Sequence, residues 1–295
     1  MKMDINFMPQ KWLVISNCQT YGLAHSLNLL CPDADVSGMD IWEFKNKIYD
    51  SKNIISNYDM VIASPEVKSI QNSNMDYAKR VETIPNILFH AYHPDLCYAH
   101  AGNDMVKTPL DAYNSIIAIS AYNNGLTVEQ AQKFYNRNVY QKAGYFDMWG
   151  PSVQALSNEF KGAGINIDQH IINWSRRSPF MYSINHPKIN CLFDIAREFL
   201  RKNDFSSYED SNFLPHDNLA TGAGFPVYTE VAENYGVHGD YRFKIFGEYN
   251  LISLKNYLFE SYNFYNNCTK NGHAIQVEDY AVSRYQVVSS LMTKG

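Results

Sequence analysis

Residues 11–30, KWLVISNCQTYGLAHSLNLL, place a short apolar run directly before an amphipathic segment. The run at 12–15 contains a β-branched pair and is followed by two polar residues, which is typical of a buried strand. Three leucines then recur at spacings of four and three, as on one face of a helix, and Pro32 ends that pattern. Cys18 is therefore predicted to lie on a strand-to-helix turn.

Two further apolar runs in the first hundred residues, 58–64 and 84–90, also predict strands. Helical stretches are expected around 40–52 and 66–83. Alternating strands and helices predict a parallel sheet with helices on its faces, and ligands gather at the carboxyl ends of such strands. The polar residues expected at these ends are Ser16, Asn17, Cys18, Ser64, His90 and His93.

The pattern changes near residue 110, beyond which helical periodicity dominates. Thr127 with Gln130 three residues later predicts a helix N-terminus with a capping box. Other helices are expected around 116–121, 151–161, 167–175, 187–202, 226–235 and 250–266.

The predicted fold class is α/β: a short parallel sheet with flanking helices, followed by a mostly helical C-terminal half. We expect a single large domain over 1–295, with an α/β part at 10–110 that carries the Cys18 turn and a mainly helical part at 111–295.

Composition narrows the function classes. The chain has 295 residues, of which 45% are hydrophobic and 19% charged, as in a folded globular protein. A net charge of -5 and the lack of a basic block argue against nucleic acid as a partner. The first apolar run, of about five residues, is too short for a signal sequence or a membrane span, which predicts a cytoplasmic protein. The five cysteines form no CxxC pair, so free thiols are expected.

Cys18 is a candidate nucleophile. On a strand-to-helix turn, backbone N–H groups and the helix dipole lower the pKa of a thiol, which would make thiolate available near neutral pH. The side-chain amides of Asn17 and Gln19, together with Ser16, could line the site and stabilise an oxyanion. The arrangement is similar to the nucleophile turn of SGNH hydrolases, with a thiol in place of the serine. The alternative is a small buried side chain without chemistry.

A thiol nucleophile needs a base, and two histidine segments offer one. His93 is followed closely by the Asp95 carboxylate, which could orient an imidazole. His186 lies between Asn185 and a proline that holds the preceding residue extended. The alternative for each histidine is a structural role in a turn.

Basic residues near the second histidine segment suggest a phosphate contact. Arg176 and Arg177 form a basic pair, and Lys188 follows the histidine; guanidinium groups bind phosphates bidentately. A solvated surface pair is the alternative. No metal site is expected, because His90, His93 and His100 lack the helical spacing of a zinc site.

Several segments in order resemble the WcbI family of capsular polysaccharide biosynthesis proteins, over most of 12–245. They are SNCQ (16–19), FHAYHPDLCY (89–98), TPLDAYNSIIAISAYNNGLT (108–127), AGYFDMW (143–149), FMYSINHPK (180–188) and FPVYTEVAENYG (225–236).

The resemblance implies an α/β enzyme that binds coenzyme A and acts as an O-acetyltransferase. The segments 17–19, 93–95 and 185–187 match the family's Asn-Cys-Gln, His-Pro-Asp and Asn-His-Pro. Two positions depart from the pattern: Ser16 replaces glycine, and Asn114 replaces a histidine that could be the catalytic base. Asn114 and Ser115 are predicted to lie at the cofactor.

These observations lead to one preferred function and two alternatives. The preferred function is acetyl transfer from acetyl-CoA to a sugar hydroxyl of a bacterial capsular or surface polysaccharide, or its precursor. Either Cys18 attacks the thioester with His93 or His186 as base, or a histidine activates the sugar directly. The alternatives are an esterase or deacetylase with the same site, and a non-catalytic protein that binds coenzyme A or a glycan. The sequence does not determine whether the protein forms a homo-oligomer.

Overall fold

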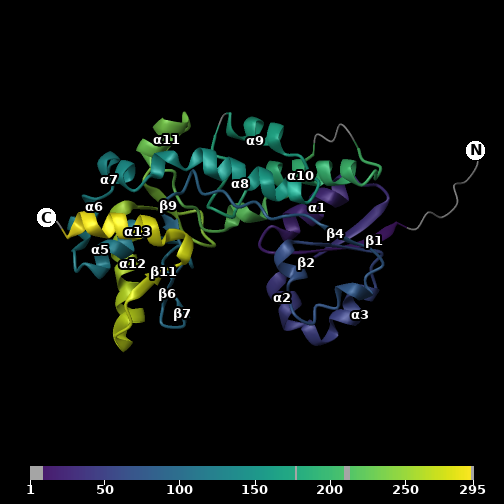
Figure 1. Cartoon of the computed structure of the whole chain (residues 1–295), viewed down its shortest axis with the longest axis horizontal. Helices are drawn as coiled ribbons and strands as arrows, with labels where there is room; N and C mark the ends of the chain where they lie inside the picture. The colour runs from purple at the N-terminus through teal and green to yellow at the C-terminus, as the bar shows by residue number, and fades with distance from the viewer. Residues whose placement is uncertain (1–8, 177, 209–212, 294–295) are drawn as a thin grey trace, which may run out of the picture. The chain divides into compact units, whose positions relative to one another are not determined.

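A computed structural model describes residues 9–176, 178–208 and 213–293, and their packing forms two compact units (Figure 1). The first unit takes the described residues of 1–88, 155–176 and 186–219, and the second those of 89–154, 177–185 and 220–295. The boundaries do not follow the division expected near residue 110, because helices from the later chain join the N-terminal sheet. Whether the chain is one domain stays a prediction.

A four-stranded parallel sheet, in the order β2-β1-β3-β4, is the centre of the first unit. The strands are β1 (Gln10–Ser16), β2 (Ala34–Asp40), β3 (Met60–Ala63) and β4 (Val81–Thr83). Trp12 pairs with Val36 on one side and Met60 on the other. Because β1 has a neighbour on both sides and helices on both faces, its residues from 12 to 16 are buried. The α/β prediction with a parallel sheet is confirmed.

Two details of the sheet differ from the sequence expectations. The strand expected at 84–90 lies at 81–83 instead, and 84–90 is irregular, because Pro85 has no N–H to donate to a ladder. The helix expected over 66–83 is reduced to α4 (Pro65–Lys68) and a short 3-10 turn. Strand β2 was not expected, since its sequence, ADVSGMD, has few β-branched residues.

Helices cover both faces of this sheet. On one face, α2 (Ile41–Asn46) and α3 (Ser51–Ser56) pack over a core that includes Leu13, Phe44 and Val61. On the other, α1 (Thr20–Leu30) lies against α10 (Ile189–Lys202). A Cβ at Gly22 would stand 2.6 Å from Leu192 Cδ1, so the absence of a side chain allows this close approach.

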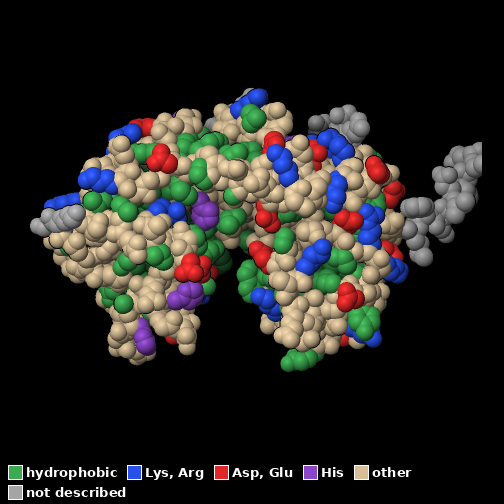
Figure 2. Space-filling model, viewed as in Figure 1, with side chains coloured by type: hydrophobic (Ala, Val, Ile, Leu, Met, Phe, Trp, Pro, Cys, Tyr) green, Lys and Arg blue, Asp and Glu red, His purple; other side chains and the backbone are tan. Residues whose placement is uncertain are grey.

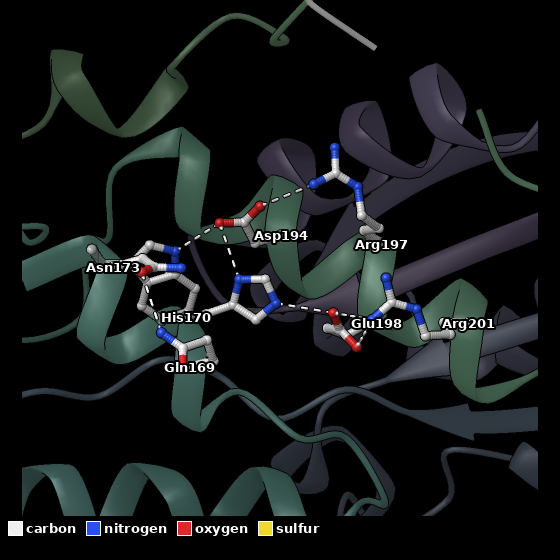
Figure 3. A network of polar contacts seen from close by, with 8 residues as sticks. Gln169, His170, Asn173, Asp194, Arg197, Glu198 and Arg201 are labelled. Atoms are coloured by element: carbon white, nitrogen blue, oxygen red, sulfur yellow. Dashed lines mark hydrogen bonds and ion pairs between the residues drawn. The ribbon is translucent and has the colours of Figure 1, made fainter. Parts of the chain in front are cut away.

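Helix α9 (Asp168–Ser175) is joined to α10 by a polar network (Figure 3). The two ring nitrogens of His170 face Asp194 Oδ2, at 3.4 Å, and Glu198 Oε1, at 2.9 Å. Trp174 Nε1 donates to the same Asp194 oxygen at 2.8 Å. These carboxylates raise the pKa of His170 more than its partial burial lowers it.

The second unit is mainly helical, with short antiparallel sheets of two or three strands. Its strands are β5 (Leu96–Cys97), β6 (Ala99–Ala101), β7 (Asp104–Met105), β8 (Asn114–Ser115), β9 (Arg242–Lys244), β10 (Leu251–Ser253) and β11 (Ile275–Val277). Its helices are α5 (Ile116–Asn123), α6 (Val128–Gln132), α7 (Arg137–Lys142), α11 (Thr229–Tyr235), α12 (Leu254–Cys268) and α13 (Asp279–Met292). Helix α8 (Trp149–Gly162) has residues in both units.

The helix predictions beyond residue 110 are confirmed for α5 and for α8 to α12, and α7 and α13 are additions. The capping box of α6 is also confirmed: Thr127 accepts from Gln130 N, and the Gln130 side chain accepts from Thr127 N. In the described part of the chain, no helix is both long and apolar enough to cross a bilayer. Basic and acidic side chains are interspersed over the face in Figure 2.

Candidate functional site

The Cys18 turn is built by its neighbours. Strand β1 ends at Ser16 and α1 begins at Thr20, as predicted. The Asn17 carbonyl accepts from Thr20 N at 3.1 Å and Thr20 Oγ1 at 2.7 Å. Asn17 Oδ1 accepts from Gln19 N at 3.0 Å and from Cys18 Sγ at 3.7 Å. The half-buried thiol therefore lies at the carboxyl end of the central strand, held beside the Asn17 amide.

The ionisation of Cys18 differs from the expectation. Desolvation raises the pKa of the thiol to about 12, with a smaller rise from the charge of Glu66, and the backbone of the turn lowers it only in part. The predicted thiolate at neutral pH is therefore wrong: the surroundings of the sulfur outweigh the helix terminus. Cys18 is a neutral thiol at pH 7 and would need a base to react as a nucleophile.

Gln19 and Ser16 anchor the turn to the chain after β4. The Gln19 carboxamide is buried, where its Nε2 donates to Ile87 O at 2.8 Å and its Oε1 accepts from Ile87 N at 3.0 Å. Ser16 Oγ donates to Asn86 Oδ1 at 2.5 Å. The Gln19 side chain thus holds a loop, whereas the sequence suggested an oxyanion donor. Asn17 is the amide that remains partly exposed beside the thiol.

His186 and Lys188 lie in the same unit, directly before α10. Ile189 N, in the first turn of this helix, donates to Asp217 Oδ2 at 3.1 Å. Burial lowers the pKa of His186 to about 4, against a smaller opposing effect of the Asp217 charge, so the imidazole is neutral at pH 7. Burial also lowers the pKa of Lys188.

The beginnings of α1 and α10 are in contact, which relates this segment to the Cys18 turn. The Ile189 side chain reaches within 3.2 Å of the Cβ position of Gly22, in the first turns of α1. Cys18 therefore precedes the first turn of α1, and His186 precedes the first turn of α10, the helix that α1 contacts. Arg176 is an exposed residue at the C-terminus of α9, and Arg177 lies outside the described residues.

Asp95 is the centre of a buried polar cluster in the second unit. Its oxygens accept from Tyr228 OH at 2.6 Å, Tyr145 OH at 2.7 Å, Ile117 N at 3.0 Å and Ser115 Oγ. Desolvation raises the pKa of this carboxyl, and the four donors oppose the rise. Asp95 is thus bound by three separate segments of the unit, around residues 115–117, 145 and 228.

The expected pairing of His93 with Asp95 is not formed. The Asp95 oxygens accept from the four donors above, and no hydrogen bond joins them to His93. The imidazole is buried, with its ring centroid 6.1 Å from that of Phe225. Burial lowers the pKa of His93 to about 3, with a smaller opposing contribution from the Phe225 backbone.

The remaining predicted residues of the second unit also bind their neighbours. Asn114 Nδ2 donates to Val106 O at 2.9 Å and to Ala112 O at 3.1 Å. Ser115 Oγ caps α5 by accepting from Ala118 N at 3.1 Å, besides its bond to Asp95. Asn185 Oδ1 accepts from Tyr113 OH at 2.5 Å and Ser183 Oγ at 3.2 Å.

Sequence reasoning missed Glu66, Asn86 and Asp217. Glu66 Oε2 accepts from Asn86 Nδ2 at 2.8 Å, and its charge acts on Cys18. Each is a polar residue in an irregular stretch or a short helix, distant in sequence from the residue that it affects. No local sequence pattern there indicates a contribution to the site. Within the described ranges, no three His, Cys, Asp or Glu side chains are placed to bind a metal ion together.

Comparisons with known proteins agree with this architecture. A family description, polysaccharide biosynthesis enzyme WcbI, matches residues 11–207. Curated protein sequences give no match. A solved structure of WcbI, described as a novel polysaccharide biosynthesis enzyme, superposes with a TM-score of 0.67 over 95% of this chain and 99% of that chain. The two chains share 14% sequence identity, so this likeness establishes the fold.

That structure is described as the native protein without a disulfide bond between coenzyme A and one of its cysteines. The family match spans two thirds of this chain, including the parallel sheet and the Cys18 turn. The protein therefore belongs to the WcbI family of polysaccharide biosynthesis enzymes.

Proposed function

We propose that the protein is an acetyl-CoA-dependent O-acetyltransferase that modifies a sugar of a polysaccharide or its precursor. The observation that carries the proposal is the Cys18 thiol, half-buried at the carboxyl end of the central strand. In open α/β sheets this end is where ligands bind. The relative of the same fold is described with reference to a disulfide between coenzyme A and a cysteine, which supports a thiol close to a coenzyme A sulfur.

Cys18 is the cysteine of this chain that suits such a contact. Cys31, Cys97 and Cys191 are buried, and Cys268 lies at the end of α12 in the second unit. Cys18 alone among the five follows a sheet strand at its carboxyl end. A neutral thiol also suits this position, because it can lie beside a thioester without introducing a charge.

The residues of the first unit can be given definite tasks. Acetyl-CoA would supply an activated acetyl group. Cys18 Sγ bonds to the acetyl carbon while His186 accepts the thiol proton, and that proton then passes to the departing coenzyme A sulfur. A sugar hydroxyl next takes the acetyl group from Cys18, as His186 accepts the hydroxyl proton and returns it to Sγ. Asn17 and the backbone of the turn are the donors available to the oxyanion.

The pKa values show that a thiol route needs a base. A thiol with a pKa of about 12 contributes little thiolate at pH 7. The His186 imidazole is neutral there and can accept a proton, although a pKa of about 4 makes it a weak base. In a second route, a histidine deprotonates the sugar hydroxyl directly and Cys18 only lines the pocket. Loss of the thiol separates these two routes.

The test is release of coenzyme A thiol from acetyl-CoA, with and without a de-O-acetylated bacterial polysaccharide. We expect release to require the acceptor, and mass spectrometry to find acetyl groups on the polysaccharide. Cys18→Ala should lose transfer if the thiol carries the acetyl group, while Cys268→Ala, the control at another half-buried cysteine, should retain it. Release of acetate whether or not the acceptor is present would instead identify a hydrolase.

The histidine is identified by two parallel variants. His186→Ala should remove transfer if His186 is the base, whereas loss with His93→Ala alone would assign that role to His93. Binding of coenzyme A without any turnover by the wild-type protein would contradict the transferase.

A further inference from the structure

A cavity of about 480 Å³ lies beside strand β4, on the open edge of the parallel sheet in the first unit. Its volume falls in the range of small-molecule sites. One wall is β4 with α4, and the other is the C-terminal end of α8 and of α10. The polar side chains that line it are Lys68, Glu82, Thr83, Asn158, Glu159 and Lys202.

Two lysines and two glutamates, Glu82 and Glu159, line the cavity, and the lysine charges are unevenly paired. Lys68 Nζ donates to Thr83 Oγ1 at 2.6 Å and forms no ion pair with any described residue. Lys202 Nζ lies 3.3 Å from Glu82 Oε2, but the same carboxylate also binds Arg80 through two hydrogen bonds. One carboxylate therefore faces two cations, and an anion can be held by the remaining charge.

The edge of the strand adds backbone donors to this charge. Val61 N, on β3, donates to Arg80 O, and the registered pairs are Val61 with Val81 and Ala63 with Thr83. Backbone groups alternate in direction along a parallel ladder, so the N–H groups of Val81 and Thr83 point away from β3. Edge N–H groups of this kind are available to phosphate oxygens.

The other lining groups suit sugar hydroxyls. Glu159 and Asn158 are exposed on α8, and carboxylate and amide oxygens accept hydrogen bonds from hydroxyl groups. We propose that this cavity binds a phosphorylated sugar, with the phosphate at Lys68, Lys202 and the β4 edge and the hydroxyls at Asn158 and Glu159.

The cavity is linked to the Cys18 turn by a short hydrogen-bond chain. Ser16 Oγ donates to Asn86 Oδ1, and Asn86 Nδ2 donates to Glu66 Oε2 on α4, two residues before Lys68. This part of the inference rests on the proposed function, under which two ligands contain a phosphorylated sugar. One is coenzyme A, through its 3′-phosphoribose, and the other is an acceptor in the form of a sugar phosphate.

Calorimetric titration of the full chain tests the site without any turnover. The probes are glucose 1-phosphate with glucose as its unphosphorylated partner, and coenzyme A with dephospho-coenzyme A. One of the two phosphorylated probes is expected to bind in the cavity. We expect the double variant Lys68→Gln/Lys202→Gln to lower the affinity for that probe by about tenfold or more, since charge-assisted hydrogen bonds are lost. Lys45→Gln, on the exposed surface of α2, is the matched control and should leave the affinity unchanged.

The two sources give different results. If the acceptor uses the site, glucose 1-phosphate binds more tightly than glucose and the double variant removes the difference. If coenzyme A uses the site, the double variant lowers the affinity for coenzyme A to that for dephospho-coenzyme A. Lys68→Arg/Lys202→Arg should retain binding, and an unchanged melting temperature shows that each variant is folded.

The proposal is overturned if neither phosphorylated probe binds, or if a folded double variant binds both probes as tightly as the wild-type protein. Phosphate-dependent binding with no acetyl transfer would contradict the proposed function but would still support the proposed phosphate site. Acetyl transfer that is unaffected by the double variant at limiting concentrations of both substrates would contradict the site alone.

Discussion

The carboxamide of Gln19 and the backbone of Ile87 exchange two hydrogen bonds across 68 residues of sequence, which ties the Cys18 turn to the loop after β4. Both partners are buried, so neither can be replaced by water without local opening. The position of the thiol at the carboxyl end of β1 therefore depends on a neighbouring side chain that performs no chemistry.

Replacement of Gln19 by alanine should destabilise the first unit. Ile87 would keep a buried N–H and C=O without partners, and we expect the free energy of unfolding to fall by about 2 kcal/mol. Urea unfolding measures the change, and Gln71→Ala, at an exposed position, is the control. An unchanged unfolding midpoint for Gln19→Ala would show that the loop is held by other contacts.

The raised pKa of Cys18 predicts slow alkylation at neutral pH. With a pKa of about 12, the thiolate fraction and the rate should rise about tenfold per pH unit through pH 7 to 10. Labelling with iodoacetamide, followed by mass spectrometry of the Cys18 peptide, measures the rate, and Cys18→Ala identifies the peptide signal. A rate that levels off below about pH 8 would show that the turn lowers the thiol pKa after all.

The Asp95 cluster should be a major source of stability in the second unit. Asp95→Ala leaves two tyrosine hydroxyls, the Ser115 hydroxyl and the Ile117 amide without their acceptor, and we expect a loss of about 3 kcal/mol or more. Asp95→Asn keeps one acceptor oxygen and should lose less.

Thermal and urea unfolding compare these two variants with Asp104→Asn, an exposed aspartate of β7. If Asp95→Ala unfolds at the same denaturant concentration as the control, the cluster does not contribute to stability as its contacts indicate.

His170 should make stability depend on pH near neutrality. Its pKa is raised above 6.5 by Asp194 and Glu198, so the folded protein binds this proton more tightly than the unfolded chain does (Figure 3). The contribution is fully present below about pH 6.5 and is lost as the pH rises through the pKa of the folded state.

His170→Gln should therefore flatten the decrease in unfolding free energy above about pH 6.5, as measured by urea unfolding at a series of pH values. His25→Gln, an exposed histidine on α1, is the control and should keep the wild-type profile. Identical pH profiles for His170→Gln and the wild-type protein would exclude the network as the source.

Local patterns in the sequence were sufficient for strand β1, for most of the helices and for the place of Cys18. The apolar run before Ser16, the leucine spacing after it and the Thr127–Gln130 pair are short-range signals, and the structure has a strand, a helix and a capping box there. The strand expected at 84–90 failed for a reason that is also local, because Pro85 interrupts the ladder.

Only the tertiary structure decided what the polar residues do. Gln19 binds Ile87 and Asp95 binds Tyr228, partners 68 and 133 residues away that no spacing rule connects. The pKa of Cys18 likewise depends on desolvation by the groups packed around the sulfur, which outweighs the helix terminus that the sequence reveals. The chain by itself determined where the thiol lies, and three-dimensional packing determined its charge and its neighbours.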